Sequence, residues 1–530
     1  MRGPDADSPL SHDGPLRRRR RRARSTLLAG DDGLVGDRDV AGLASAADRR
    51  LTRRRLLAAG ATTTAAAAFG LTFELSSSRG RSAVFEQLAA PRARAFLSRP
   101  DLRIPTLTVS AYGEPVAPGL IFFAPSNAPN GAQAGAVIAD NNGELIWEQP
   151  LPHTETMDFR VQTYKGRPAL TWWQGYITLG HGVGHYVIAD TSYRTLATPN
   201  AGNGLQGDLH EFLLTDRGTA LLTSYLVTHA DLRPVGGSAD GTIQDAIFQE
   251  LDIATGRVLL DWHSLDHIAL SESYWPVGEN WDYVHLNSIA VDQDEDLLVS
   301  SRSAHTIYKL DRASGQVIWR LGGKHSDFAI APDAVFAWQH DARRQPDGTI
   351  TVFDNGNKIS RALVLNVDEP NRRVTLQRAY THPANLHADS QGNVQVLPNG
   401  NIFVGWGAQP YISEFTPDGE LALDARLASD DISYRAYRVP WTGEAPGLPA
   451  VATRRSGSHT DVYVSWNGDT RVTRWTALAG TTPTNLVPTA SVPRRGFETT
   501  MRIPRACTHL RVQGNDATGQ PLATTNSITI

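Results

Sequence analysis

Cysteine is almost absent from this sequence: Cys507 is the only one among 530 residues. No disulfide can therefore form within the chain, and no zinc site made of cysteines can be built. Folding must rest on packing alone. The composition is 41% hydrophobic and 20% charged, which is ordinary for globular domains and allows a large core.

The N-terminal part lacks a long run of large apolar residues. The letters TRRRLL at 52–57 place paired arginines directly before a stretch of small, mildly apolar residues that reaches Ala68, and Glu74 follows. This stretch is a poor membrane-spanning helix, which needs about 20 apolar residues. We interpret 1–82 as a disordered leader that carries a twin-arginine export signal. The alternatives are an uncleaved signal that tethers the protein to a membrane, and a plain basic tail.

The rest of the chain lacks an excess of positive charge. Residues 1–82 hold 16 Lys and Arg against 9 Asp and Glu, which leaves 35 against 46 for residues 83–530. So acidic a body would repel phosphate backbones, and the arginine run at 17–22 belongs to the leader. We therefore expect no nucleic-acid partner. The export signal in the leader predicts a protein located outside the cell, in the cell envelope or anchored to the membrane.

Short strands joined by tight turns dominate the remainder. Two kinds of hairpin alternate, for example AVIADNNGELIW at 136–147 and LLTDRGTALL at 213–222, each with Gly, Asn or Asp at the turn. Two such hairpins make a four-stranded blade, and their spacing predicts about six blades. We predict an all-β protein with a six-bladed β-propeller at 126–440, preceded by an N-terminal segment at 83–125. A series of β-sandwiches is the structural alternative.

A linker-like composition, GEAPGLP at 443–449, separates the last part of the chain. Beyond it, strands alternate with period two across an Asn-Gly turn at 467–468 and continue to the end. We predict a small C-terminal β-sandwich of immunoglobulin or fibronectin type at 441–530.

Histidines stand at the starts of the predicted inner strands. They are His210, His285 and His340, and Asn287 and Arg302 lie on or next to the strands of the His285 blade. The starts of inner strands line the channel of a propeller, so these side chains should converge. A single histidine of this kind is more often a buried structural residue. Three imidazoles could also bind zinc or copper, but Asn287 and Arg302 are poor metal ligands and good donors to an oxyanion.

The motifs around these residues resemble the arylsulfotransferase family. HLNS at 285–288, SSR at 300–302, IWRLGG at 318–323 and WQHDAR at 338–343 occur in this order, and DLHEF at 208–212 and FDNG at 353–356 are typical of the actinobacterial branch. The likeness covers about 99–437. It implies a six-bladed propeller that moves a sulfuryl group from an aryl sulfate to a phenolic or other hydroxyl acceptor, without a nucleotide donor and without a cofactor or metal.

The resemblance also implies roles for the channel residues. His340 matches the nucleophile that forms a sulfohistidine, and the residues that match the sulfuryl-stabilising set are His210, His285, Asn287 and Arg302. The better-studied periplasmic members carry a disulfide, which this chain cannot form, and a longer N-terminal domain. Aromatic candidates for a phenol pocket are Trp172, Trp173, Trp281, Tyr283, Trp338 and Trp406, although tryptophans in propellers usually pack in the blades.

Two other functions fit parts of the sequence. A non-catalytic extracellular propeller could bind a glycan or a protein, and water in place of the phenol acceptor would make the chain an aryl sulfatase-like hydrolase. A quinone-dependent dehydrogenase lacks support, because no tryptophan docking repeat and no calcium-carboxylate cluster can be traced.

Overall fold

The computed structural model describes residues 93–126, 134–151, 153–356, 358–428 and 431–530. The predicted leader and its twin-arginine signal lie outside the described residues. Within them the chain is built of strands, with one short α-helix, α3 (Ser264–His267), and the 3₁₀ turns η2 (Arg233–Val235), η3 (Leu270–Glu272) and η4 (Pro332–Ala334). The all-β prediction is confirmed. No described helix is long and apolar enough to cross a membrane.

Between residues 107 and 439 the described strands form six sheets, each built mainly of consecutive antiparallel strands. The first three sheets comprise β7 (Glu155–Tyr164), β8 (Arg167–Thr178), β9 (His181–Ala189) and β10 (Thr195–Ala197); β11 (Phe212–Leu214), β12 (Thr219–Ala230), β13 (Gly241–Asp252) and β14 (Val258–His263); and β15 (Leu286–Val291), β16 (Leu297–Ser301), β17 (Thr306–Leu310) and β18 (Val317–Gly322).

The fourth sheet comprises β20 (His340–Arg344), β21 (Ile350–Asp354), β22 (Arg361–Asp368), β23 (Arg373–Tyr380) and a short parallel strand, β19 (Ala329–Ile330). The fifth comprises β24 (Asn393–Val396), β25 (Ile402–Gly405), β26 (Tyr411–Phe415), β27 (Leu421–Leu427) and β3 (Leu107–Ala111). The sixth comprises β28 (Ser433–Val439), β4 (Leu120–Pro125), β5 (Gly135–Ala139) and β6 (Leu145–Pro150).

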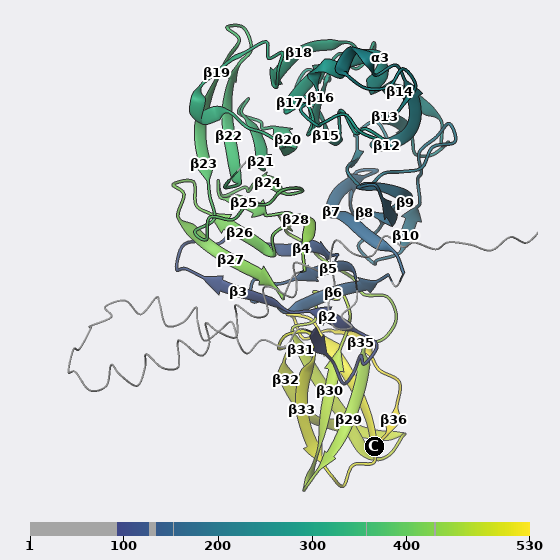
Figure 1. Cartoon of the computed structure of the whole chain (residues 1–530). Helices are drawn as coiled ribbons and strands as arrows, with labels where there is room; N and C mark the ends of the chain where they lie inside the picture. The colour runs from purple at the N-terminus through teal and green to yellow at the C-terminus, as the bar shows by residue number, and fades with distance from the viewer. Residues whose placement is uncertain (1–92, 127–133, 152, 357, 429–430) are drawn as a thin grey trace, which may run out of the picture. The chain divides into compact units, whose positions relative to one another are not determined.

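The two ends of this region are joined within the sheets. Strand β3 pairs with β27, and β28 pairs with β4, although more than 300 residues separate each pair in sequence. The segment before residue 126 therefore supplies strands to the last two sheets. Five of the first strands, β7, β15, β20, β24 and β28, face a common centre in Figure 1. The first strand of the remaining sheet, β11, contacts β7, and β28 also contacts β7.

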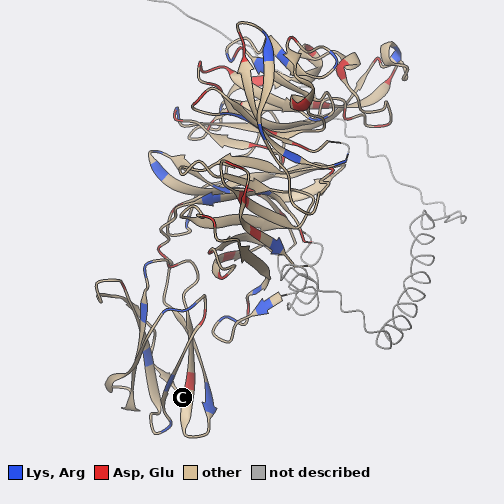
Figure 2. Cartoon of the chain, turned by 90° about the vertical axis from the view of Figure 1, so that its left-hand side faces the viewer, with Lys and Arg blue, Asp and Glu red and all other residues tan. Residues whose placement is uncertain are grey.

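The C-terminal part has its own core. Its strands are β29 (Ala450–Ser456), β30 (His459–Ser465), β31 (Arg474–Thr482), β32 (Asn485–Pro493), β33 (Thr499–Pro504), β34 (His509–Asn515), β35 (Pro521–Thr524) and β36 (Ile528–Thr529). They form two sheets that share buried side chains such as Val462, Trp475 and Val512. A further pair, β1 (Ala93–Ala95) and β2 (Arg103–Pro105), lies at the start of the described chain. Figure 2 shows acidic and basic residues scattered among the described strands and loops.

A buried network of charges links the centre of the six sheets. Three arginines face three carboxylates there: Arg160, Arg343, Arg435, Asp158, Glu211 and Asp341. Five of the six are buried, and the side chain of Arg343 is 17% exposed. Glu211 is the hub, since Arg160 and Arg343 each donate to one of its oxygens. Burial raises the pKa of Glu211, but the guanidinium groups outweigh it and hold this pKa well below its usual range.

Backbone groups of the remaining sheets complete this network, which we call the ion layer. Arg435 donates to Asp158 at 3.0 Å and to the carbonyl of Asn287 in β15 at 2.8 Å. The backbone N–H of Val394 in β24 donates to Asp341 at 3.3 Å. Every one of the six sheets therefore contributes a partner, and the ion layer fixes their first strands relative to one another.

Replacing Arg435 by leucine should destabilise the protein strongly. Arg435→Leu leaves Asp158 and Glu211 short of a buried counter-charge, and breaking such a pair typically costs about 3–5 kcal/mol. The matched control is Arg217→Leu, whose partner Glu295 lies at 2.6 Å with both side chains about half exposed; this should cost less than about 1 kcal/mol. Guanidinium unfolding followed by tryptophan fluorescence measures both. Equal losses in the two variants would show that the ion layer does not hold the sheets.

Candidate active site

The structure brings the three sequence-predicted histidines together. His210 lies two residues before β11, His285 directly precedes β15, and His340 is the first residue of β20. The ring centroids of His210 and His285 lie 4.8 Å apart, and those of His285 and His340 lie 6.4 Å apart. His210 and His340 are buried, and the side chain of His285 is 13% exposed. Three sheets thus place an imidazole at the same end of their first strands.

A fourth histidine, His181, joins this group. Its ring centroid lies 5.6 Å from that of His210 and 5.1 Å from that of His285, and it stacks on Tyr225 at 3.7 Å. His181 begins β9, the third strand of its sheet, directly after the β8–β9 turn. The repeat pattern of the sequence marks only the starts of first strands, so it does not point to His181. The glycines at 180 and 182, which mark a turn next to His181, were the available signal.

Two aspartates orient these rings. Asp208 accepts from Nδ1 of His210 at 2.7 Å, and one oxygen of Asp282 lies 2.5 Å from Nδ1 of His285 and 3.1 Å from Nε2 of His181. Burial opposes ionisation of both carboxyls, but the neighbouring imidazoles outweigh it and keep the pKa of each well below its usual range. Asp208 belongs to the DLHEF motif, whereas Asp282 had not been singled out.

Burial and the contacts with Asp282 shift the pKa values of His285 and His181 in opposite directions. Burial lowers the pKa of His285 to about 4, although Asp282 opposes this shift. Burial also works against a proton on His181, but there Asp282 outweighs it and raises the pKa. The site therefore holds a ring that favours the neutral form beside one that favours the charged form.

His340 has a different environment. Its Nδ1 donates to the side-chain oxygen of Asn355 at 2.7 Å, because the amide nitrogen of Asn355 donates to the backbone carbonyls of Ala388 and Gln391. Nε2 then carries the lone pair, which accepts a hydrogen bond of 3.2 Å from the backbone N–H of Gln391. This bond is longer than the one between Nδ1 and Asn355. Burial, together with the charge of Arg302, lowers the pKa of His340 well below its usual range. His340 is therefore a neutral imidazole with a defined tautomer.

Asn287 and Arg302 differ in how free their donors are. The amide nitrogen of Asn287, which is fully buried, already donates to the carbonyl of Gln339 at 2.7 Å. Arg302 donates from one Nη to the carbonyl of Asp389 at 3.0 Å, and its Nε has no partner among the described residues. Its guanidinium lies 5.1 Å from the ring centre of Trp338 and 5.6 Å from that of Trp275. Arg302 thus keeps donors available beside His340.

The aromatic candidates divide into two groups. Five of the six are buried, namely Trp172, Trp173, Trp281, Tyr283 and Trp406. Trp338 is only partly buried and lies beside Arg302, and Trp275, which is 44% exposed, meets it edge to face with centroids 5.7 Å apart. Trp275 stands in a loop without a repeat pattern, so sequence reasoning gave no reason to select it.

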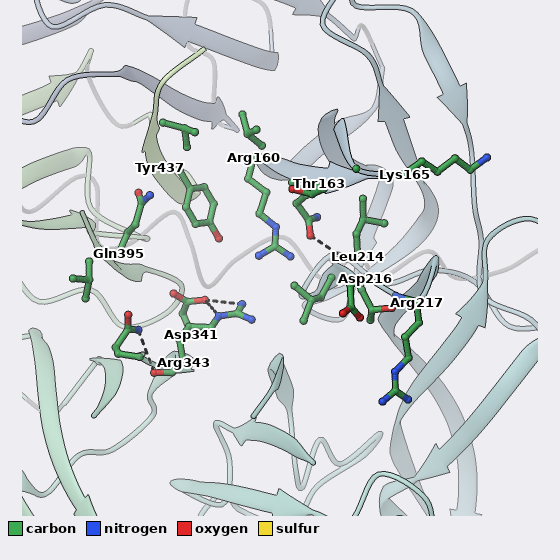
Figure 3. A pocket seen from close by; sticks show the side chains of 18 of the residues that line it. Arg160, Thr163, Lys165, Leu214, Asp216, Arg217, Asp341, Arg343, Gln395 and Tyr437 are labelled. Carbon is green, nitrogen blue, oxygen red and sulfur yellow. Dashed lines mark hydrogen bonds and ion pairs between the residues drawn. The ribbon is translucent and has the colours of Figure 1, made fainter. Parts of the chain in front are cut away.

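A large cavity lies at the opposite ends of the first strands. It has a volume of about 830 Å³, and the turns at 163–166 and 215–218 contribute to its lining. Figure 3 shows Arg160, Asp341 and Arg343 of the ion layer beside it. None of the sequence-predicted site residues lines this cavity. The histidines precede these strands in the chain and the cavity lies at their far ends, so the two are distinct sites.

Comparison with known proteins gives one informative match. The profile of the family described as arylsulfotransferase (ASST) matches residues 160–428. None of the curated proteins compared with the chain matches it. Solved structures give weak likenesses. One is a Bacteroides caccae protein of unknown function, with 14% identity, a TM-score of 0.39 and coverage of 60% of this chain and 98% of that one.

Another is a catalytically inactive virginiamycin B lyase from Staphylococcus aureus with quinupristin, with 8% identity, a TM-score of 0.32 and coverage of 68% of this chain and 97% of that one. The family profile spans half of the chain and includes His210, His285 and His340. The chain therefore belongs to the arylsulfotransferase family.

Proposed function

We propose that this protein transfers a sulfuryl group from an aryl sulfate ester to a phenolic or other hydroxyl acceptor, without a nucleotide donor, through a sulfohistidine on His340. The observation that carries the proposal is the neutral, tautomerically fixed ring of His340 beside the cation of Arg302, in a chain of this family.

In the first half of the reaction, the lone pair on Nε2 of His340 attacks sulfur. The N–S bond forms as the bond between sulfur and the aryl oxygen breaks, and the electron pair of that bond leaves with the phenolate. The Nδ1–H group of His340 keeps its hydrogen bond to the side-chain oxygen of Asn355, and this acceptor stabilises the positive charge that develops on the ring. Before Nε2 can attack, the 3.2 Å hydrogen bond that it accepts from the backbone N–H of Gln391 must break.

The other polar groups of the site stabilise the sulfuryl oxygens or give a proton to the leaving group. Arg302 offsets the negative charge of the sulfuryl oxygens, and His210 and His285 face the same group from the neighbouring sheets. A sulfate ester brings a negative charge to these rings and so favours their protonated form. A protonated ring then gives its proton to the leaving phenolate. The buried amide of Asn287 acts by holding the backbone at Gln339 in place, next to His340.

In the second half, an acceptor phenol gives its proton to the ring that lost one. Its oxygen attacks sulfur, the N–S bond breaks, and the electron pair returns to Nε2 of His340. Donor and acceptor use the site in turn, which gives ping-pong kinetics. Water in place of the phenol would give hydrolysis, so product analysis decides between transferase and sulfatase-like activity.

We also propose a finer architecture for the fold and a location for the protein. The six sheets are read as the blades of a six-bladed propeller, and the C-terminal sheets as a sandwich of immunoglobulin or fibronectin type. The twin-arginine signal at 52–57 exports the folded chain, and the chain's motifs assign it to the actinobacterial branch of the family. Outside the cytoplasm nucleotide sulfate donors are absent, which suits an exchange between two phenols.

Mixing the protein with p-nitrophenyl sulfate in the absence of an acceptor should add one sulfuryl group to it. Intact-mass analysis and peptide mapping should place this group on the peptide that contains His340, and His340→Ala should abolish both labelling and transfer to an added phenol. The control is His382→Ala, because His382 is also buried and bonded to a carboxylate, Asp424, but lies in another part of the sheets. Labelling of His340→Ala at the normal rate would overturn the assignment.

The first half-reaction should not slow on the acid side, where an ordinary histidine titrates. An imidazole with a pKa of 6.5 is about three-quarters protonated at pH 6, but the lowered pKa of His340 keeps its ring neutral there. We expect the quenched-flow burst of nitrophenol not to slow between pH 7.5 and 6, since protonation of the ring that gives its proton to the phenolate raises the rate. In Arg302→Gln, which removes a charge that lowers this pKa, the burst should slow and its acid limb should move to higher pH. A wild-type limb near pH 6.5 would contradict this.

Export can be tested with charge-conserving changes in the leader. The triple variant Arg53→Lys, Arg54→Lys, Arg55→Lys keeps the positive charge but removes the arginine pair, so the protein should remain in the cytoplasmic fraction of a host that has the twin-arginine system. Arg49→Lys with Arg50→Lys is the control and should export normally. Unchanged fractionation of the triple variant would exclude this route.

A further inference from the structure

Three of the clustered histidines have the arrangement of a metal-binding site. One ring nitrogen from each of His181, His210 and His285 lies within 4.8 Å of the others. The rings come from three different parts of the chain, before β11, before β15 and at the start of β9. His340 is not part of this set, because its two nitrogens are bonded to Asn355 and Gln391.

Each of these rings has one nitrogen bonded to a carboxylate. His210 and His285 use Nδ1 for Asp208 and Asp282, and His181 uses Nε2 for Asp282. Such carboxylate–histidine pairs fix the tautomer of metal-binding imidazoles and raise their basicity as ligands. They leave Nε2 of His210, Nε2 of His285 and Nδ1 of His181 as the nitrogens with lone pairs in the neutral rings.

The free nitrogen of His181 is an independent sign of a ligand. His181 is only 3% exposed, and its Nδ1 has no hydrogen-bond partner among the described residues. A buried ring nitrogen without a partner is costly, since it has lost water and gained nothing. A metal ion bound by the three rings would satisfy it.

The balance of charge favours a divalent ion. Within ion-pair distance, Asp208 and Asp282 meet only these imidazoles among the described side chains. Metal binding displaces the proton that His181 favours, because an imidazole ligand must be neutral. With three neutral rings the cluster carries two negative charges in a buried place, which one divalent cation neutralises. Imidazole ligands suit zinc, copper and nickel, and three of them with an open position make the common catalytic type of zinc site.

We propose that His181, His210 and His285 bind one Zn²⁺ or similar transition-metal ion, and that this ion and the sulfuryl group of the donor compete for the site. Zinc bonds of about 2.0–2.1 Å in a tetrahedron place the ligand nitrogens about 3.3 Å apart, so the rings close inward on the ion. Bound metal occupies the nitrogens that His210 and His285 turn toward the sulfuryl oxygens. The competition rests on the proposed function, whereas the binding of metal does not.

Metal binding is measured first without any turnover. The full chain, purified without a histidine tag and stripped with a chelator, should bind one Zn²⁺ in isothermal titration calorimetry and retain one zinc in elemental analysis. His181→Ala should weaken binding more than about 100-fold, and Asp282→Asn, which removes a supporting carboxylate, by about 10–100-fold. The control His229→Ala removes an exposed histidine that also pairs with an aspartate, Asp240, and should bind as the wild type does.

Two results would overturn the metal site. One is a wild-type chain that binds no Zn²⁺ with a Kd below about 1 mM, and the other is a His181→Ala chain that binds as tightly as the wild type while its circular dichroism shows it folded. Asp282→Asn provides a second variant if His181→Ala does not fold, and unchanged affinity in it would have the same meaning.

Transfer assays then test the competition. Zn²⁺ should inhibit sulfuryl transfer by the wild type, with an inhibition constant that rises with the p-nitrophenyl sulfate concentration, and His181→Ala should need more than about 100-fold more zinc for the same fractional inhibition. Binding that depends on His181 in a chain without transferase activity would refute the proposed function and keep the metal site. Transfer that zinc does not affect, in a chain that binds zinc through His181, would refute only the competition.

Discussion

The ion layer is the constraint on which the rest of the structure depends. Glu211 receives guanidinium groups from three other sheets, through Arg160, Arg343 and Arg435, and a backbone N–H from Ile289 in a fourth. Because these charges are buried, any sheet that moved would leave one of them without a partner, and that cost is several kcal/mol. A chain that cannot form a disulfide therefore still has a strong, specific link between strands that are hundreds of residues apart. The histidines lie one or two residues before residues of the ion layer. The ion layer therefore also fixes the positions of the histidines.

The junction between the ion layer and the histidines is made of backbone in an uncommon conformation. Asp158, His285 and Asp341 have φ values of 51°, 51° and 55°, and each lies at or beside a change of register in its sheet. Asn, Asp and His adopt this left-handed region more readily than other residues with a side chain, and such bulges redirect side chains at the edge of a sheet. The bulges let one short strand present an imidazole at its start and a charge of the ion layer one or two residues later. Strain of this kind is typical of functional sites.

Much of the fold and part of the site could be predicted from sequence, because local rules govern them. Turn residues and period-two alternation are local, so the hairpins were predictable, and with them the place of His210, His285 and His340 at strand starts. His181 and Asp282 were missed because their roles depend on which loops meet across sheets. Asn287 was predictable as a neighbour of the site but not as a side chain whose amide holds a backbone carbonyl. The ion layer has no local signature, since each of its charges looks like an ordinary polar residue in a strand.

The site separates two tasks by the partners of its rings. His340 has an amide oxygen behind it and a guanidinium near it, and both its burial and that cation disfavour a proton, so its ring favours the neutral form. His181, His210 and His285 have carboxylates behind them, which make the rings able to accept either a proton or a metal ion. The same electrostatic arrangement that would hold a sulfuryl group through protonated rings would hold a cation through neutral ones. Which of the two occupies the cluster depends on what the surroundings supply.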